Sequence, residues 1–237
     1  MLSGPQNSAS DDPLASRLAA LRLRICAAAE AAGRDVRSIT LLAVSKGQPP
    51  SRLRAAAALG IAEFGENYLP EALPKIRALQ DLAPVWHFIG RLQANKTRSV
   101  AENFSWVHSV DRLKIAERLS LQRPHFSPPL NLCIQVNILD EATKGGITPD
   151  ETLALLPFVA ALPRLRLRGL MCMLPYGATL QQQGEGFGRL RELQEEARRS
   201  GLDLDTLSMG MSADLEQAIQ EGSTMVRIGT ALFGERA

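Results

Sequence analysis

A lysine that closes an apolar run is the first candidate for chemistry. Lys46 follows the segment TLLAVS (40–45), which is typical of a buried strand, so its amine is expected above an apolar core. Burial and a neighbouring cation both favour the neutral, nucleophilic form of a lysine amine, which attacks a carbonyl to form a Schiff base. Taken alone, a lysine at a strand end is usually a surface residue whose stem covers apolar area. Other motifs therefore decide how Lys46 is interpreted.

Two glycine-containing segments near the C-terminus are candidates for binding an anion. In SMGMSADLEQAI (208–219), Ser212 stands where a helix is expected to begin, and unpaired N–H groups at such a position attract phosphate. In RIGTALFG (227–234), Gly229 and Thr230 offer an amide and a hydroxyl after the last apolar run. Separately, the two segments are explained by a helix cap and a turn. Together they indicate a phosphate site built from the last two loops of a barrel.

Arg227 lies two residues before Gly229, so both are expected to point to the same side of a strand. A buried arginine keeps its proton and needs an acceptor. The nitrogen of a pyridine ring would serve. An ordinary ion pair with Glu63 or Glu66 is the alternative.

The remaining histidines, methionines and cysteines indicate no metal and no redox centre. His87 and His108 lie inside apolar runs without a second ligand at metal spacing, so each is interpreted as a core or rim histidine. The three cysteines are odd in number and far apart, which favours a reducing compartment. The methionines near the sixth and seventh runs are interpreted as barrel filling or as the wall of a ring-binding pocket: Met171, Met173, Met209 and Met211.

Short apolar runs alternate with helical segments along the chain, and we count eight strands. Their residues are 40–46, 63–67, 86–90, 106–110, 131–138, 167–173, 206–210 and 225–230. Eight strands separated by helices predict a parallel sheet closed into a single (β/α)8 TIM barrel of the α/β class. A doubly wound open sheet is the alternative.

Two segments stand apart from this alternation. Pro13 begins an amphipathic helix that Gly33 ends, so an extra helix precedes the barrel. The polar residues 1–12 are interpreted as a disordered tail, and residues 13–237 as one barrel domain. The proline-rich stretch 122–130 is interpreted as a loop before the fifth strand.

Charge and hydropathy exclude several classes of protein. The net charge is +2 and no basic stripe with interleaved aromatics is present, so nucleic acid is not an expected partner. No apolar window approaches the length of a membrane helix, and no secretory leader is recognised. We therefore expect a cytoplasmic protein with no membrane partner.

Eight strings of the sequence together resemble the YggS/PROSC family of pyridoxal 5′-phosphate (PLP) homeostasis proteins. They run in unbroken order from Leu41 to Arg236, and WHFIG-x-LQ-x-NK and LSMGMS-x-D are the most specific among them. The strings are LLAVSKGQPP, FGENYLPEALPKI, WHFIGRLQANKTRSV, VHSVDRLKIAERL, CIQVNILDEATKGGI, LRGLMCM, LSMGMSADLEQAI and VRIGTALFGER.

The resemblance implies a fold-type III PLP protein, similar to the N-terminal barrel of alanine racemase. It implies that Lys46 forms the aldimine with PLP, while Ser212, Gly229 and Thr230 hold the phosphate. Arg227 would face the pyridine nitrogen and keep it unprotonated, which weakens the ring as an electron sink. The same resemblance places three further residues beside the ring: Asn67, His87 and Met209.

The family resemblance also implies a function without catalysis. Such proteins bind PLP and hand it to apoenzymes, so we expect a PLP carrier and regulator rather than an enzyme. A PLP-dependent amino-acid racemase is the main alternative, and a Schiff-base aldolase is a more distant one. Racemisation needs two bases on opposite faces of the cofactor, and only one is visible. The chain ends soon after the eighth strand, without the β-domain of alanine racemase, so a monomer is expected.

Three positions depart from the family pattern. Gln48 stands where a basic residue is common, Arg91 where proline or histidine is common, and MLPYG (173–177) follows the sixth strand. We expect all three on the rim, where they would affect contacts with partners or effectors and leave PLP binding intact.

Overall fold

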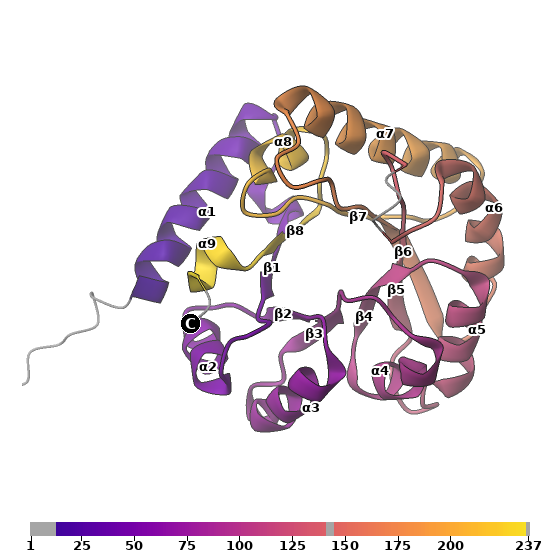
Figure 1. The fold of residues 1–237 in the computed structure, drawn as a ribbon, viewed down its shortest axis with the longest axis horizontal. Helices are drawn as coiled ribbons and strands as arrows, with labels where there is room; N and C mark the ends of the chain where they lie inside the picture. Colours follow the sequence, from indigo (N-terminus) through magenta and orange to yellow (C-terminus); the bar gives the residue numbers. More distant parts are fainter. Residues whose placement is uncertain (1–12, 141–144, 236–237) are drawn as a thin grey trace, which may run out of the picture.

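The protein is a closed barrel of eight parallel strands, as seen in a computed structural model that describes residues 13–140 and 145–235 (Figure 1). Each strand pairs with the next one in sequence, and Thr40–Ala43 pairs with Met225–Ile228 to close the ring. The predicted (β/α)8 barrel is confirmed, and the open-sheet alternative is wrong. The strands are β1 (Thr40–Val44), β2 (Glu63–Glu66), β3 (Val85–Phe88), β4 (Trp106–Val110), β5 (Leu130–Gln135), β6 (Leu165–Met171), β7 (Thr206–Ser208) and β8 (Met225–Ile228).

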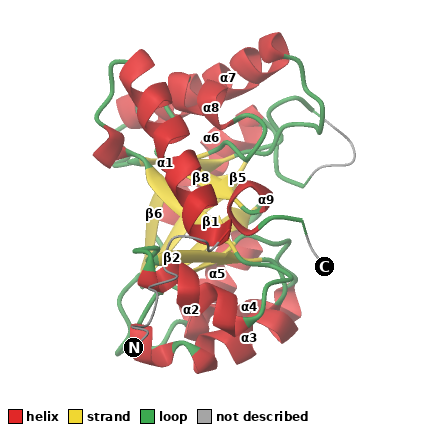
Figure 2. Ribbon diagram, turned by 90° about the vertical axis from the view of Figure 1, so that its left-hand side faces the viewer, coloured by secondary structure: helices red, strands yellow, loops and turns green. Residues whose placement is uncertain are grey.

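Helices surround the strands, and the barrel seen from the side lies between helices above and below it (Figure 2). The α-helices are α1 (Pro13–Ala31), α2 (Pro50–Ala58), α3 (Leu69–Ala78), α4 (Thr97–Asn103), α5 (Leu113–Gln122), α6 (Pro149–Ala160), α7 (Leu180–Arg199), α8 (Leu215–Gln220) and α9 (Thr230–Phe233). Short 3-10 turns are η1 (Val36–Ser38), η2 (Gln80–Leu82) and η3 (Ala94–Lys96). No helix among these described residues is long and apolar enough to cross a membrane.

The extra N-terminal helix is present and packs against α8 and α9 (Figure 1). Its buried face repeats at helical spacing through Leu14, Leu18, Leu21 and Ile25, as predicted. Gly33 follows with φ +64°, a left-handed conformation that glycine adopts without steric cost. The proposed tail 1–12 lies outside the described residues.

The loop predicted before the fifth strand is also present. Residues 123–129 connect α5 to β5, and the buried guanidinium of Arg123 donates hydrogen bonds to the carbonyl oxygens of Ala101, Phe104 and Pro128 at 2.6–2.9 Å. These bonds hold the loop against α4.

The strands separate two sets of buried side chains. Outward-facing apolar residues such as Ala43, Phe64 and Leu170 pack beneath the helices in one large core. Trp106, Cys133 and Met171 form a separate, smaller apolar cluster on the other face of the strands, inside the barrel. Besides this cluster, the interior holds the buried polar side chains of His87, His108, Ser208 and Arg227, together with a few apolar side chains such as Leu42. Most of the apolar burial is therefore outside the barrel, and the interior carries the hydrogen-bonding groups.

Candidate functional site

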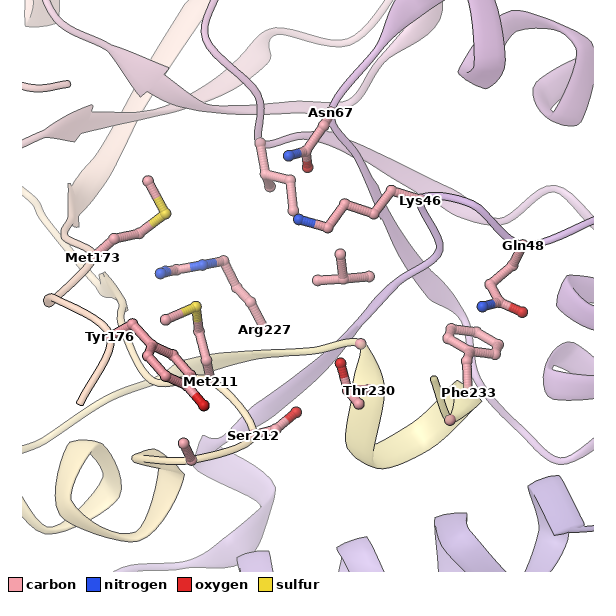
Figure 3. Close-up of a pocket in the computed structure, with 15 residues that line it drawn as sticks. Lys46, Gln48, Asn67, Met173, Tyr176, Met211, Ser212, Arg227, Thr230 and Phe233 are labelled. Atoms are coloured by element: carbon pink, nitrogen blue, oxygen red, sulfur yellow. The ribbon is translucent and has the colours of Figure 1, made fainter. Parts of the chain in front are cut away.

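A cavity of about 290 Å³ opens at the carboxyl ends of the strands (Figure 3). Active sites of this fold form at that end, from the loops that connect each strand to the next helix. Six of the eight residues predicted for the site line the cavity: Lys46, Asn67, Ser212, Arg227, Gly229 and Thr230. Its other lining residues are Val44, Gln48, Ile89, Met173, Tyr176, Met211, Ala213, Phe233 and Gly234.

Lys46 reaches the cavity from the turn that follows β1. It lies two residues after Val44, so both side chains project from the same face of the strand into the barrel mouth. Gly47 then takes φ +76°, which turns the chain toward α2. In Figure 3 the amine of Lys46 points into the cavity beside Asn67 and toward Arg227.

A buried ionic cluster outside the barrel holds this turn by its backbone. Lys75 Nζ donates to the carbonyl oxygen of Ser45 at 2.7 Å, to Glu66 Oε1 at 2.7 Å and to Glu71 Oε1 at 2.5 Å. Glu71 Oε1 also accepts from the backbone N–H of Gly47 at 2.5 Å. Burial raises the pKa of Glu66, against the lowering effect of Lys75. The backbone on both sides of Lys46 is therefore fixed by charged hydrogen bonds.

Asn67 presents a polar atom without a partner. It follows β2, and its Oδ1 is buried without a hydrogen-bond partner among the described residues. The neighbouring Gly90 permits this position, since a Cβ there would collide with the backbone of Asn67. A buried amide oxygen of this kind is costly unless a ligand or water pairs with it. The Asn67 amide is therefore a candidate ligand contact.

Arg227 lies at the floor of the cavity and is 4% exposed. Nη1 donates to the carbonyl oxygen of Ser208 at 2.5 Å and to its Oγ at 2.9 Å, and Nη2 donates to the carbonyl oxygen of Cys172 at 2.8 Å. A guanidinium has five N–H donors, so two have no partner among the described residues. Burial lowers the pKa of Arg227.

The alternative ion pair of Arg227 with Glu63 or Glu66 is wrong. Glu66 bonds to Lys75 outside the barrel, and Glu63 lies beside His87. The acceptors of Arg227 within the protein are carbonyl and hydroxyl oxygens instead. Arg227 therefore has no ion pair with a carboxylate among the described residues.

Ser212, in the loop after β7, and Thr230, the first residue of α9, come together at the cavity, and their hydroxyls face each other in Figure 3. The expected role of Ser212 at the start of its own helix is wrong, because α8 begins at Leu215 with Asp214 at the N-cap. The Asp214 carboxylate accepts from the backbone N–H of Met211 at 2.5 Å, which closes a tight turn before the helix. Ser212 Oγ instead accepts from the Ala231 backbone N–H at 3.2 Å, in the first turn of α9.

The extra helix α1 supports both of these loops. Arg24 donates to the carbonyl oxygen of Ser212 at 3.0 Å and forms an ion pair with Glu216 at 2.7 Å. Arg17 donates to the carbonyl oxygen of Phe233 at 3.2 Å. The helix that precedes the barrel in sequence therefore fixes the two loops that follow its last strands.

His87 and Met209, two of the eight predicted residues, do not line the cavity. His87 is fully buried in β3, one inward-facing position below Ile89, which does line it. Met209 follows Ser208, whose side chain points into the barrel, so alternation turns Met209 outward into the core beneath the helices. One residue is too deep, and the other is on the opposite face.

Several lining residues were not predicted. Ile89 shares the inward parity of Lys46 and Arg227 on its own strand, and this alternation could have identified it. Met173 and Met211, interpreted from the sequence as barrel filling or as the wall of a ring-binding pocket, do line the cavity. Tyr176 is fully exposed and lies in the loop after β6, where no periodic pattern indicates its direction. Gln48 is buried and lines the cavity, so this departure from the family pattern lies within the site and not on its rim.

A second cavity of about 350 Å³ adjoins the first at Asn67. Arg91, Gln93 and Lys96 line it, and all three are exposed. Arg91, another departure from the family pattern, therefore lies outside the first cavity.

The geometry suits one class of ligand. A lysine amine and a partly unpaired arginine meet across a cavity walled by apolar side chains such as Ile89, Met173 and Met211. Two hydroxyls and the loops that carry them lie at another edge. Such a site can hold an anionic molecule with a carbonyl within reach of the amine.

Comparison with known proteins agrees with this geometry. Residues 17–237 match the family described as "Alanine racemase, N-terminal domain". The chain is 56% identical over 223 residues to the "Pyridoxal phosphate homeostasis protein" of Pseudomonas aeruginosa, covering 94% of this chain and 96% of that protein. It is 50% identical over 226 residues to the protein of the same name from Escherichia coli K12, covering 94% and 97% of the two chains.

Solved structures show the same fold. PipY of Synechococcus elongatus, determined with PLP bound, has a TM-score of 0.82 and 38% identity, covering 93% of this chain and all of that one. Alanine racemase of Corynebacterium glutamicum shares the fold at a TM-score of 0.67 and 18% identity, and this chain covers 62% of it. This chain belongs to the family of pyridoxal phosphate homeostasis proteins, which is built on the alanine racemase N-terminal barrel.

Proposed function

We propose that the protein binds PLP as a Schiff base on Lys46 and hands it to apoenzymes, without catalysing a reaction of its own. The observation that carries this proposal is the convergence of Lys46, Arg227 and the Ser212 and Thr230 hydroxyls on one cavity. The names of the two bacterial relatives and the PLP bound to PipY support it.

The residues of the cavity fit PLP group by group. The Lys46 amine lines the cavity and would condense with the aldehyde, and the hydroxyls of Ser212 and Thr230, with the Gly229 amide, suit the phosphate. The two N–H groups that Arg227 leaves unpaired suit the pyridine nitrogen. The buried Asn67 amide, whose oxygen has no partner among the described residues, suits a polar substituent of the ring.

The same residues favour carriage over catalysis. When bound, PLP supplies an electron sink, and the sink is strong only when its ring nitrogen is protonated. Arg227 donates a hydrogen bond and keeps its proton, so it does not protonate that nitrogen. Racemisation also needs an acid or base on each face of the substrate carbon. Besides Lys46, Tyr176 is a lining residue that could act as an acid or base. It is fully exposed at the mouth of the cavity and is not held over Lys46.

We further propose that the protein acts in the cytoplasm as a monomer, with apo-PLP enzymes as partners. The three free cysteines support a reducing compartment, since two of them, Cys133 and Cys172, are buried thiols. Burial raises the pKa of each of these two thiols to about 12, so neither is a reactive thiolate.

Two assays on the purified protein loaded with PLP test this function. The first mixes it with an apo-PLP enzyme and measures recovered activity, which we expect for the wild type. The second incubates it with alanine in deuterated water and follows exchange at Cα by NMR, where we expect no turnover. Lys114→Ala is the matched control, because Lys114 is exposed on α5 away from the cavity. Rapid exchange or stereoinversion that depends on Lys46 would make the protein a racemase and contradict the carrier proposal.

A further inference from the structure

A row of hydrogen-bonded side chains crosses the interior of the barrel beneath the cavity. Ser208 Oγ accepts from Arg227 at 2.9 Å and lies 2.8 Å from His108 Nδ1. His108 Nε2 lies 2.9 Å from His87 Nδ1. His87 Nε2 lies 3.0 Å from Glu63 Oε2, which is a charge contact without the geometry of a hydrogen bond. Five residues from five strands or strand ends thus connect the cavity floor to the other end of the barrel.

The charged ends give this row a single direction. An arginine only donates, so the hydrogen of the Ser208 hydroxyl is left to be donated to His108 Nδ1. An ionised carboxylate oxygen 3.0 Å away repels the lone pair of a bare ring nitrogen, so His87 carries its hydrogen on Nε2, beside Glu63. His87 Nδ1 is then an acceptor, which requires the hydrogen of His108 on Nε2. Each group in the row therefore donates in one direction, and the arrangement is satisfied when both histidines are neutral.

The surroundings of the histidines agree with this assignment. Both are completely buried, and burial lowers the pKa of His87 and His108. The charges of Arg227 and of a protonated His87 would lower the pKa of His108 further, whereas Glu63 opposes the shift at His87. Trp106 stacks on His87 with ring centroids 5.4 Å apart and an interplanar angle of 9°, and Arg168 covers the Trp106 ring at 4.7 Å. The ring of His87 has little freedom to turn.

We infer that Ser208, His108, His87 and Glu63 are positioning residues, which act as one directed hydrogen-bond chain to set the orientation of Arg227 at the cavity floor. The chain accepts one N–H of the guanidinium, and the Ser208 and Cys172 carbonyl oxygens accept two more. This leaves the two remaining N–H groups for the ligand. The role of the chain toward PLP rests on the proposed function, whereas its hydrogen positions do not.

The hydrogen positions are tested first, in the protein without PLP. Long-range ¹H–¹⁵N NMR of histidine-labelled protein reports the tautomer of each ring, and His87→Gln and His108→Gln assign the signals. We expect both rings as neutral Nε2–H tautomers at pH 6–8. Glu63→Leu should shift the ¹⁵N signals of both rings, whereas Glu63→Gln, which keeps an acceptor, should leave the tautomers unchanged. A ring with its hydrogen on Nδ1 alone, or a charged ring at pH 7, would overturn the inference.

The effect on the ligand is tested with Ser208→Ala, which interrupts the chain next to Arg227. We expect PLP to bind about tenfold more weakly, a loss that corresponds to about 1.4 kcal/mol, and its absorbance maximum to move. Ser120→Ala is the control, because it removes another buried serine hydroxyl whose acceptor is the Pro163 carbonyl oxygen, away from the cavity. It should leave the affinity and the spectrum unchanged.

The outcomes separate this inference from the proposed function. If wild-type protein binds PLP and Ser208→Ala binds it with the same affinity and spectrum, the positioning role is contradicted while the proposed function stands. If the wild type does not bind PLP, the proposed function fails, and the NMR tautomers still decide whether the chain exists.

Discussion

Two polar networks meet at the cavity from opposite sides of the barrel wall, and they work differently. Outside the barrel, Lys75 binds Glu66 and Glu71 and holds the backbone that carries Lys46. Inside, a row of side chains runs from Glu63 through His87, His108 and Ser208 and contacts the side chain of Arg227. The outer network is made of full charges packed together, whereas the inner one separates its two charges by neutral groups.

The difference matches what each network holds. Under the proposed function Lys46 exchanges bonds with PLP, and a side chain that can move on a fixed backbone suits this role. The proposed role of Arg227 needs a fixed side chain instead, because hydrogen bonds from a guanidinium to a ligand depend on direction. The comparison therefore predicts that substitutions in the outer network lower mainly the free energy of unfolding. Substitutions in the inner network should lower mainly the affinity for PLP.

The largest expected effect is that of Lys75→Met. It leaves Glu66, whose side chain is 0% exposed, without its cation, and breaking a buried pair in this way typically costs about 3–5 kcal/mol. We expect a loss of this size in the free energy of unfolding, measured by urea denaturation at pH 7. The double variant Lys75→Met with Glu66→Gln is the control and should recover a large part of it. Equal losses in the two variants would show that the charge of Glu66 is not the cause.

The second prediction separates the two networks by pH. The folded state raises the pKa of Glu66 from its ordinary 4.5, so the folded protein binds more protons there and stability falls as pH rises above 4.5. The pKa of His108 is instead lowered from 6.5, so the unfolded state binds more protons and stability is lost as pH falls below 6.5.

Urea denaturation across pH 4–8 checks both signs. Glu66→Gln should remove the part of the stability loss that appears as pH rises above 4.5. His108→Gln should remove the part that appears as pH falls below 6.5. A steeper loss of stability at acid pH in His108→Gln would contradict the neutral histidine.

The third prediction concerns the phosphate loops. Ser212→Ala and Thr230→Ala should each weaken PLP binding by about 1.5–3 kcal/mol, the usual size of a hydrogen bond to a charged group. Pyridoxal, which lacks the phosphate, is the matched ligand and should lose almost nothing. Isothermal titration of both ligands measures the difference. Equal losses for PLP and pyridoxal would remove the phosphate role from these hydroxyls.

A smaller effect is expected for Arg24→Ala on α1. Its ion pair with Glu216 is about half-exposed, and surface pairs contribute about 0.2–1 kcal/mol to stability. The bond to the Ser212 carbonyl oxygen is the more specific contact, so PLP affinity should fall a few-fold. Arg37→Ala, which breaks an exposed pair with Asp35 remote from the cavity, should leave affinity unchanged. Loss of affinity in both variants would indicate a general effect of charge.

Much of the barrel was predictable because its signals are local and repeat. Each strand is a short apolar run followed by a helical segment. The predicted runs contain every observed strand except for the first residue of β3 and of β5 and the first two residues of β6. The positions of Lys46, Ser212 and Thr230 followed from the rule that barrel sites form after the strands, and that of Arg227 from its spacing of two residues before Gly229. These residues converge because the fold brings their strand ends together.

The errors in the predicted site concern how deep a side chain lies in the barrel and which face of its strand it occupies. A family resemblance gives neither. His87 is inward-facing but one layer too low, and Met209 is one residue out of phase with Ser208. Lys75 left a signal that was not used: it shares the buried face of α3 with Leu69 and Ala72, where a lysine needs a partner. No comparable signal pairs His87 with His108, because the two meet only when neighbouring strands are in register.

The most direct test of the account is to locate the PLP. The chain has five lysines, at positions 46, 75, 96, 114 and 144. Borohydride reduction of the PLP-loaded protein followed by peptide mapping should label Lys46 alone, and Lys46→Ala should lose both the label and the visible absorbance band while unfolding at nearly the same urea concentration. A single label on another lysine, or a full label retained in Lys46→Ala, would contradict the assignment of Lys46 and the site built around it.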